Sequence, residues 1–409
     1  MKSILIRPLC MFLMLYTFLF FSCDNNLTGT KQMVQAFKIP ELLNRNAKIQ
    51  NGKEWDDVQS SYQKQKMDLQ KNQKDYEAAI RLSQLFIREA RVTGEHGHYY
   101  PAALKMTQYV LQDSANNDMK FLALVTQAGV QLSLHEFEAA LETGQKAIQL
   151  NQRNPQIYGV MVDAHVELGK YSEAIEYADM MIALKPDLRS YARISYLREI
   201  HGQVSEAIEA MKMAVKAGIP GQEDTAWAMN TLAEMYKMYG DNQKAKATFE
   251  EILAMRPHYP FAVGGLSEIA LDENNFTLAE AKVNEAIDII PEVGFYITLA
   301  EIYQKTNRKN QADETIKEIF AMLQDDQDSG HNMNLEYANV YLNLQNDPDM
   351  ALKYALAEYN KRPKNIDVNR IMAKIYMAKN DVEKTKEHTK IAQSTQSKHP
   401  EIIDLIAHI

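Results

Sequence analysis

The chain has 409 residues, a formal net charge of −9 and an apolar fraction of 46%. Glycine (16) and proline (12) are sparse for this length, which favours long helices over a turn-rich β fold. The acidic balance and the absence of a Lys/Arg-rich tract in the sequence argue against a nucleic-acid partner.

Residues 1–22 have the pattern of a secretory signal peptide. Two basic residues precede an apolar run from Leu9 to Phe21, which is too short to span a bilayer comfortably. The run ends in FFSC, and a small residue directly before a cysteine at this point resembles the lipobox of a bacterial lipoprotein, with Phe20 in place of the usual leucine. The resemblance implies that Cys23 becomes the lipidated first residue of the mature chain. The alternative is an ordinary cleaved signal in which Cys23 has no role.

The segment after the signal is predicted to contain a tether and a helix. Residues 23–53 begin with a polar stretch that lacks hydrophobic periodicity, which indicates a flexible tether. Residues 54–74 are predicted to form an N-terminal capping helix. No cysteine follows Cys23, so the folded body has no disulfide framework, cysteine nucleophile or cysteine metal site.

Small residues then recur at a nearly constant spacing. The spacing is 33 or 34 residues, apart from two gaps of 38 and 39 residues where segments are inserted. The recurring residues are Ala140, Ala174, Ala207, Ala245, Ala279, Ala312 and Ala351. Five residues before each stands a glycine or an asparagine, except before the first, where His135 takes this place. Glycine and asparagine favour the left-handed conformation that ends a helix. Each period is therefore predicted to be helix, tight turn, helix, with the small residue letting the two helices approach closely.

The period and its motifs resemble the tetratricopeptide repeat (TPR) family. Helix-A motifs of the form Leu-Ala-x-x-Tyr begin at Leu232 and Leu299, and a Gly-x-Tyr turn begins at Gly169. The resemblance covers residues 75–399, about nine repeats, and implies an all-α, right-handed α-solenoid. Residues 400–409 are predicted to form a C-terminal capping helix. Together with the lipoprotein-like start, the array is similar to envelope TPR lipoproteins of the Bacteroidota.

Residues with metal-binding or catalytic chemistry are few. Glu95, His96 and His98 lie close together in sequence, and histidines two apart can share a metal ion if further ligands converge. No further ligands can be identified in the sequence, so a structured loop between helices is the favoured interpretation and no metal is predicted. No catalytic motif and no cofactor-binding motif is evident, and we predict no enzymatic activity.

A concave partner-binding surface is what the family resemblance implies, because the first helices of TPR units line a groove that usually holds a peptide or partner helix. Glu234, Glu268 and Glu301 take equivalent places in three successive units, and Arg370 and Lys374 lie on the first helix of the last unit. One hypothesis is a groove that is acidic in its middle and basic toward its C-terminal end, with Trp227 at its edge. The alternative is a solvated surface without a binding role.

The leading interpretation is a lipid-anchored scaffold for protein–protein interactions at the bacterial cell envelope, with the outer membrane as the expected location. The partners would be proteins or peptides, and the lipid would supply the only membrane contact. An assembly or secretion accessory that captures client proteins is a narrower alternative. A binding protein for a sugar or another small ligand is a third, and an open groove favours it less.

Overall fold

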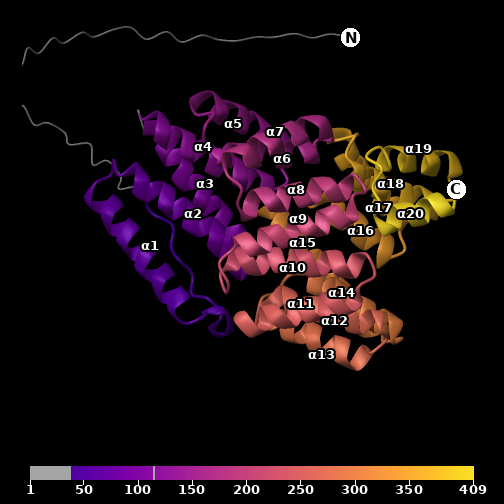
Figure 1. The fold of residues 1–409 in the computed structure, drawn as a ribbon. Coiled ribbons are helices and arrows are strands. Elements are labelled where there is room, and N and C mark those ends of the chain that lie inside the picture. The colour runs from indigo at the N-terminus through magenta and orange to yellow at the C-terminus, as the bar shows by residue number, and fades with distance from the viewer. Residues whose placement is uncertain (1–37, 114–115) are drawn as a thin grey trace, which may run out of the picture. The chain divides into compact units, whose positions relative to one another are not determined.

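The computed structural model describes residues 38–113 and 116–409. Pro40–Ile409 form one compact unit, distinct from residues 1–39, and only this unit is described below. Its regular structure in the described residues is helical throughout, which confirms the predicted all-α fold (Figure 1). The signal peptide, Cys23 and the first part of the predicted tether lie outside the described residues.

The described residues contain one short 3-10 helix and 20 α-helices. In chain order they are η1 (Ala47–Ile49), α1 (Lys53–Lys71), α2 (Tyr76–Thr93), α3 (His96–Asp113), α4 (Asn117–Ser133), α5 (Phe137–Leu150), α6 (Pro155–Glu167), α7 (Tyr171–Leu184), α8 (Leu188–Ile200), α9 (Val204–Ala217), α10 (Glu223–Met238), α11 (Asn242–Met255), α12 (Pro260–Asp272), α13 (Phe276–Ile287), α14 (Val293–Lys305), α15 (Lys309–Asp328), α16 (Asn334–Asn343), α17 (Pro348–Lys361), α18 (Ile366–Ala378), α19 (Val382–Ala392) and α20 (Pro400–Ala407). Within the described part, none of them combines the length and the apolar character that crossing a membrane requires.

Helices α2 to α19 form nine consecutive pairs in this part of the chain, from α2/α3 to α18/α19. Each pair packs within itself and against the next pair, while α1 packs on α2, and α20 on α18 and α19. A single pair is too small to bury its own apolar face, and stacking in series gives one continuous core. The chain is therefore an α-solenoid of helix-turn-helix units.

The seven recurring alanines lie where the helices of a pair meet. Each of them is at most 2% exposed. Hydrogen bonds show how closely the helices approach: Ser195 Oγ donates to the backbone oxygen of Ala207, and Ser267 Oγ to that of Ala279, both at 2.7 Å. A larger side chain at these alanines would force the two helices apart.

The turn inside each pair is left-handed, as the glycines and asparagines predict. The backbone angle φ is 70° at Gly169, 71° at Gly202 and 87° at Gly240, and it lies between 50° and 59° at the asparagines. Those asparagines are Asn274, Asn307, Asn346 and Asn380. His135, which replaces glycine in its unit, adopts the same conformation with φ at 58°.

The folded unit begins earlier than the sequence predicts, because residues 40–53, the second half of the predicted tether, belong to it. Arg45 is only 3% exposed and Ile49 only 4%. Arg45 forms two parallel bonds to Glu89 of α2, Nε to Oε2 at 2.8 Å and Nη2 to Oε1 at 2.7 Å. The segment shows no hydrophobic periodicity, because its only helical element is the three-residue η1. It is attached to the folded unit by the buried ion pair between Arg45 and Glu89.

Successive turns of the solenoid contact each other. Asn332 N donates to Leu134 O at 3.0 Å, and His135 Nδ1 donates to Asn332 O at 2.9 Å. Further along, Ile366 N donates to the Tyr171 hydroxyl at 2.8 Å. The two residues His135 and Asn332 are 197 apart in sequence, and Tyr171 and Ile366 are 195 apart. One superhelical turn therefore takes roughly six repeats of about 34 residues.

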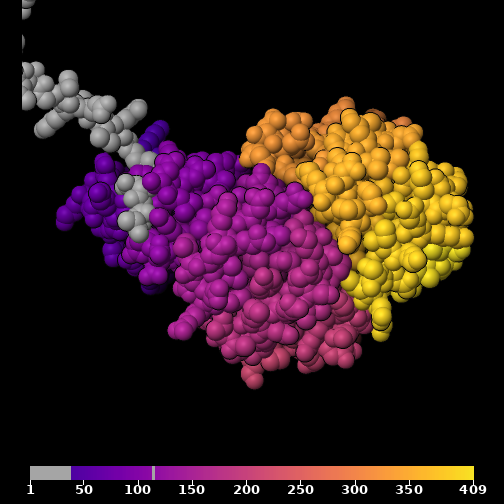
Figure 2. All heavy atoms as spheres, turned by 90° about the horizontal axis from the view of Figure 1, so that it is seen from above, coloured from indigo at the N-terminus to yellow at the C-terminus, as the bar shows by residue number. Residues whose placement is uncertain are grey.

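We call these contacts the inter-turn seam. It joins the turns at Gly94, His135, Gly169 and Gly202 to the linkers at Glu292, Asn332, Lys364 and Gln396. Figure 2 shows the result from above, with the orange and yellow atoms of the C-terminal helices directly against magenta atoms of the earlier ones. The seam places side chains from distant parts of the sequence next to each other.

Candidate partner-binding surface

The first helices α10, α12 and α14 lie side by side and carry the predicted surface. Trp227 and Glu234 lie seven residues apart on α10, which places them on one face of the helix. Trp227 is 48% exposed, an unusual state for the largest apolar side chain. Large exposed aromatic residues are typical of the centres of protein interfaces.

The three glutamates of the predicted acidic row are not equally free. Lys237 Nζ lies 2.6 Å from Glu234 Oε2 and also pairs with Glu268, so one cation bridges two members of the row. Burial alone would lower the pKa of Lys237, but Glu268 and Glu234 raise it, so the lysine stays charged. Glu301 forms no ion pair among the described residues. Burial and the neighbouring Glu268 raise its pKa. The acidic row is therefore less negative than the sequence indicates. Among its three glutamates, only Glu301 has no ion-pair partner in the described residues.

The basic residues predicted for the C-terminal end of the groove form ion pairs within the array. Arg370 lies 2.6 Å from Asp367 and 3.0 Å from Glu401, and Lys374 also pairs with Glu401. Burial alone would raise the pKa of Glu401, but Lys374 and Arg370 lower it. Glu401 belongs to the terminal helix α20, whose packing on α18 was not visible in the spacing of charges along the sequence.

A second polar surface was missed by sequence reasoning. An open cavity of about 320 Å³ lies along the seam, between the α4–α6 region and the α16–α18 region. Its lining includes five carboxylates: Asp163, Glu167, Glu336, Glu358 and Asp367. Arg362 pairs with Glu358 and Glu167, and its guanidinium lies 4.5 Å from the centre of the Phe137 ring. No sequence signal could have joined these residues, because they come from two superhelical turns.

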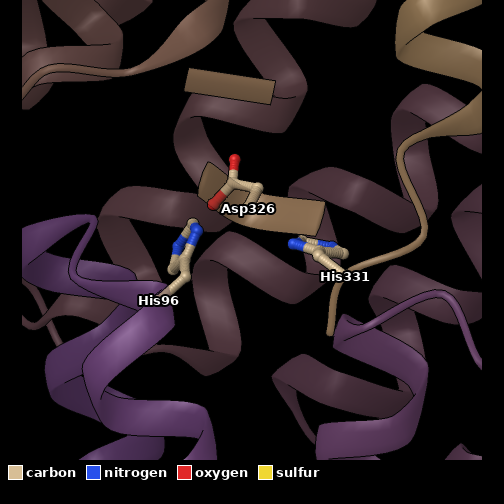
Figure 3. Close-up of side chains that lie close together, drawn as sticks. All are labelled: His96, Asp326 and His331. Atoms are coloured by element: carbon tan, nitrogen blue, oxygen red, sulfur yellow. The ribbon is translucent and has the colours of Figure 1, made fainter. Parts of the chain in front are cut away.

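The three residues weighed as metal ligands do not converge on one another. His98 Nε2 lies 2.8 Å from the backbone oxygen of Glu41 and donates to it. His96 instead lies close to Asp326 and His331, and the donor atoms of these three side chains are all within 4.8 Å of one another. Figure 3 shows the three side chains directed toward a common space.

Comparison with known proteins agrees with this architecture. Residues 240–293 match the sequence profile of the tetratricopeptide repeat family. The chain therefore contains tetratricopeptide repeats, and the nine helix pairs among the described residues extend the same architecture along it. Tetratricopeptide repeats generally serve as non-catalytic scaffolds for binding proteins, and nothing observed in the described residues indicates catalysis.

Individual relatives are distant. The small glutamine-rich tetratricopeptide repeat-containing protein 2 of Saccharomyces cerevisiae is 28% identical over 102 residues, which cover 25% of this chain and 30% of the relative. A tetratricopeptide repeat protein of Parabacteroides merdae is 14% identical with a TM-score of 0.43, covering 60% of this chain and 93% of that one. The human IFIT1 dimer with PPP-AAAA is also 14% identical, with a TM-score of 0.48 and coverage of 79% and 73%. These likenesses concern the fold alone.

Proposed function

We propose that the protein is a scaffold that holds protein or peptide partners on the surface formed by α10, α12 and α14. The observation that carries the proposal is Trp227, which is nearly half exposed on the same face of α10 as Glu234 and two helical turns before it. The turn that ends α10 is also free: a Cβ placed on Gly240 would meet nothing within 4 Å. An exposed aromatic anchor on the same helix face as carboxylates is typical of a recognition surface rather than of a packed core.

The partner that fits this surface is a segment with an apolar side chain and a basic residue. Trp227 supplies a large rigid face for apolar contact. Glu301 supplies a carboxylate without a compensating ion pair in the described part, whereas Glu234 and Glu268 already share Lys237. A lysine or arginine of the partner would complete the row. Such a contact would add specificity and a faster encounter more than affinity.

Crosslinking and pull-down from native membranes test this proposal. We expect Trp227→Ala to lose the partners captured by the wild-type chain, and Glu301→Gln to weaken capture in a salt-dependent way. Ile219→Ala is the matched control, because Ile219 is 68% exposed but lies in the linker between α9 and α10. An unchanged set of partners in a variant that combines Trp227→Ala with Glu→Gln changes at 234, 268 and 301 would remove the proposal.

The proposal includes a lipid anchor at Cys23 and a location at the bacterial cell envelope, in the outer membrane. It is supported by the signal-like start and by the small residue before Cys23. Acyl chains on one residue attach a protein to a membrane without spanning it. Intact-mass analysis of the mature N-terminus tests the anchor, and Cys23→Ser should release the protein from the membrane fraction. Protease treatment of whole cells then tells which face carries it.

Two alternatives make different predictions in the same experiments. An assembly or secretion accessory would capture its clients transiently, so partners would appear only after crosslinking. A small-ligand binder would use the seam cavity, whose five carboxylates outnumber the three arginines that pair with them, Arg193, Arg362 and Arg370, and this excess favours a cationic group over a sugar. Binding of a polyamine to the wild-type chain, but not to Glu167→Gln, would support that second function.

A further inference from the structure

His96, Asp326 and His331 form a compact cluster that the scaffold function does not use. His96 is the first residue of α3, Asp326 lies in the last turn of α15, and His331 lies in the linker to α16. Their donor atoms all lie within 4.8 Å of one another, although the sequence separates His96 from the other two by more than six repeats. Figure 3 shows the carboxylate of Asp326 beside the imidazole of His96, with the ring of His331 across from them. The cluster therefore spans the inter-turn seam.

The imidazole of His331 has an unusual environment. Both ring nitrogens are buried, and neither has a hydrogen-bond partner of acceptable geometry. The Ser133 backbone lies close enough to influence its pKa but does not form such a bond. Oε2 of the adjacent Glu336 is also buried without a partner. Buried polar atoms without partners are rare in folded proteins, and a bound ion is one of the standard reasons for them.

The protonation states fit ligands rather than an ion pair. Burial lowers the pKa of His96. Burial, with His135 and His96 nearby, lowers the pKa of His331 to about 4. Burial, with Asp325 and Glu336 nearby, raises the pKa of Asp326 to about 6. Both imidazoles are therefore neutral at physiological pH, so no cationic side chain of the cluster balances the carboxylate.

We propose that His96, Asp326 and His331 bind a first-row divalent transition-metal ion, with Zn²⁺ as the best fit, and that this ion fastens two turns of the solenoid together. Two imidazoles and one carboxylate are a donor set that zinc uses. Bonds of about 2.0–2.1 Å in a tetrahedral site place ligand atoms roughly 3.4 Å apart, so small side-chain rotations close the site. Nitrogen donors favour zinc, copper or nickel over calcium and magnesium.

His135 stands next to His331, one of the three ligands. Its ring centre lies 4.7 Å from that of His331. Because Nδ1 donates to the backbone oxygen of Asn332, Nε2 carries the free lone pair. A neutral histidine held through Nδ1 by a carbonyl is the usual state of a metal-bound imidazole. His135 is thus a candidate for the fourth position, which is otherwise left to water.

Calorimetric titration of the full chain with Zn²⁺, after treatment with a chelator, tests the proposal. We expect one Zn²⁺ per chain and a rise in the unfolding temperature that EDTA reverses. His331→Ala and Asp326→Asn should weaken binding by more than the roughly 10- to 100-fold loss that removing a hydrogen-bond partner of a ligand causes. Cobalt(II) should give the visible absorption of a four-coordinate site, and millimolar Mg²⁺ should neither stabilise the chain nor compete.

His98→Ala is the matched control, since His98 lies two residues from His96 and bonds to Glu41 outside the cluster. This variant should bind Zn²⁺ as the wild-type chain does. Asp326→Asn keeps the shape of the side chain, so it separates loss of a ligand from loss of folding. Absence of one-to-one binding in the wild-type chain, or equal binding by the wild-type chain, His331→Ala and Asp326→Asn, would overturn the proposal.

Discussion

Two sets of turns in this solenoid share one backbone conformation but differ in their surroundings. The turns at Gly169 and Gly202 lie in the inter-turn seam, whereas the turn at Gly240 does not. A Cβ on Gly169 would lie 2.6 Å from the backbone carbon of Lys364, and one on Gly202 would lie 2.4 Å from the carbonyl oxygen of Gln396. A Cβ on Gly240 would meet nothing within 4 Å.

The difference separates two reasons for a small residue at a turn. Outside the seam the left-handed conformation is the only demand, and asparagine meets it in the four later units. Inside the seam, Gly169 and Gly202 must also leave room for the backbone of the next superhelical turn. His135 also lies in the seam, but its imidazole forms a hydrogen bond to the facing linker. Turn residues in the seam must therefore fit against the next superhelical turn, in addition to adopting the left-handed conformation.

The largest expected effect on stability comes from a comparison of two arginines, each of which bonds to a glutamate through two atoms. Arg45 pairs with Glu89 at the start of the array, and neither side chain is exposed to solvent. Arg308 pairs with Glu280 outside the seam, and both side chains are about one-third exposed. We expect Arg45→Met to reduce the free energy of unfolding by about 3–5 kcal/mol, because it leaves a buried charge unpaired.

Arg308→Met should cost no more than about 1 kcal/mol, since solvent replaces much of the lost interaction. Chemical denaturation measures both values, and limited proteolysis shows whether residues 40–52 come free in the Arg45 variant. Equal losses of unfolding free energy in the two variants would mean that burial of the Arg45–Glu89 pair does not increase its contribution to stability.

A second contrast exchanges the turn residues themselves. Gly202→Asn places a side chain against the backbone of Gln396, which cannot rotate away, and should cost toward the upper end of about 1–3 kcal/mol. Gly240→Asn copies the residue found at the free turns and should leave stability within about 0.5 kcal/mol. Thermal melts give the stabilities, and small-angle scattering reports whether the Gly202 variant opens. A loss of stability of similar size in Gly240→Asn would show that the left-handed backbone conformation alone determines the cost of the substitution, and that the seam contact has no effect on it.

The repeat is the part of this molecule that the sequence predicts well. The alanine spacing and the turn residues are local features, and the structure confirms the left-handed turns that they predict. The seam is different because its contacts join residues about 195 apart, and no local pattern records the number of repeats in a superhelical turn. The cavity beside Arg362 was missed for that reason. The segment around Arg45 was missed because it lacks hydrophobic periodicity, and the pairing of Glu401 with Arg370 and Lys374 was missed because it depends on how α20 packs on α18.

Packing within a helix pair should not depend on the seam, and this gives a third test. Ala207 belongs to a unit whose turn lies in the seam, and Ala245 to a unit whose turn is free, yet both are fully buried. We expect Ala207→Leu and Ala245→Leu to lose similar amounts, about 1–3 kcal/mol each, because both overpack the same kind of helix contact. Denaturant melts of both variants measure this. No loss in either variant would contradict the packing role of the recurring alanines.

The smallest expected effect concerns the charge on Glu54, which joins Arg45 to Arg256 at the first contact between turns. Its Oε1 lies 2.8 Å from Arg45 Nη1 and its Oε2 lies 2.7 Å from Arg256 Nη1. Burial alone would raise the pKa of Glu54, but Arg256 and Arg45 lower it below 4.5. Glu89 and Glu223, the other carboxylates of this network, bond to the same two arginines.

A carboxyl group whose pKa is lower in the folded than in the unfolded chain stabilises the fold above its unfolded pKa. That contribution is lost as the pH falls through the folded pKa. Glu54→Gln should therefore be less stable than the wild-type chain at pH 7, by about 1 kcal/mol, because Glu54 is one-fifth exposed and each arginine keeps a second carboxylate partner. The difference should shrink as the pH drops below 4.5 and vanish in stronger acid. Urea melts of both proteins between pH 7 and pH 3 measure it. A difference that stays constant over this range would mean that Glu54 acts through its shape and hydrogen bonds, so that charge would have no part in this contact between the two turns.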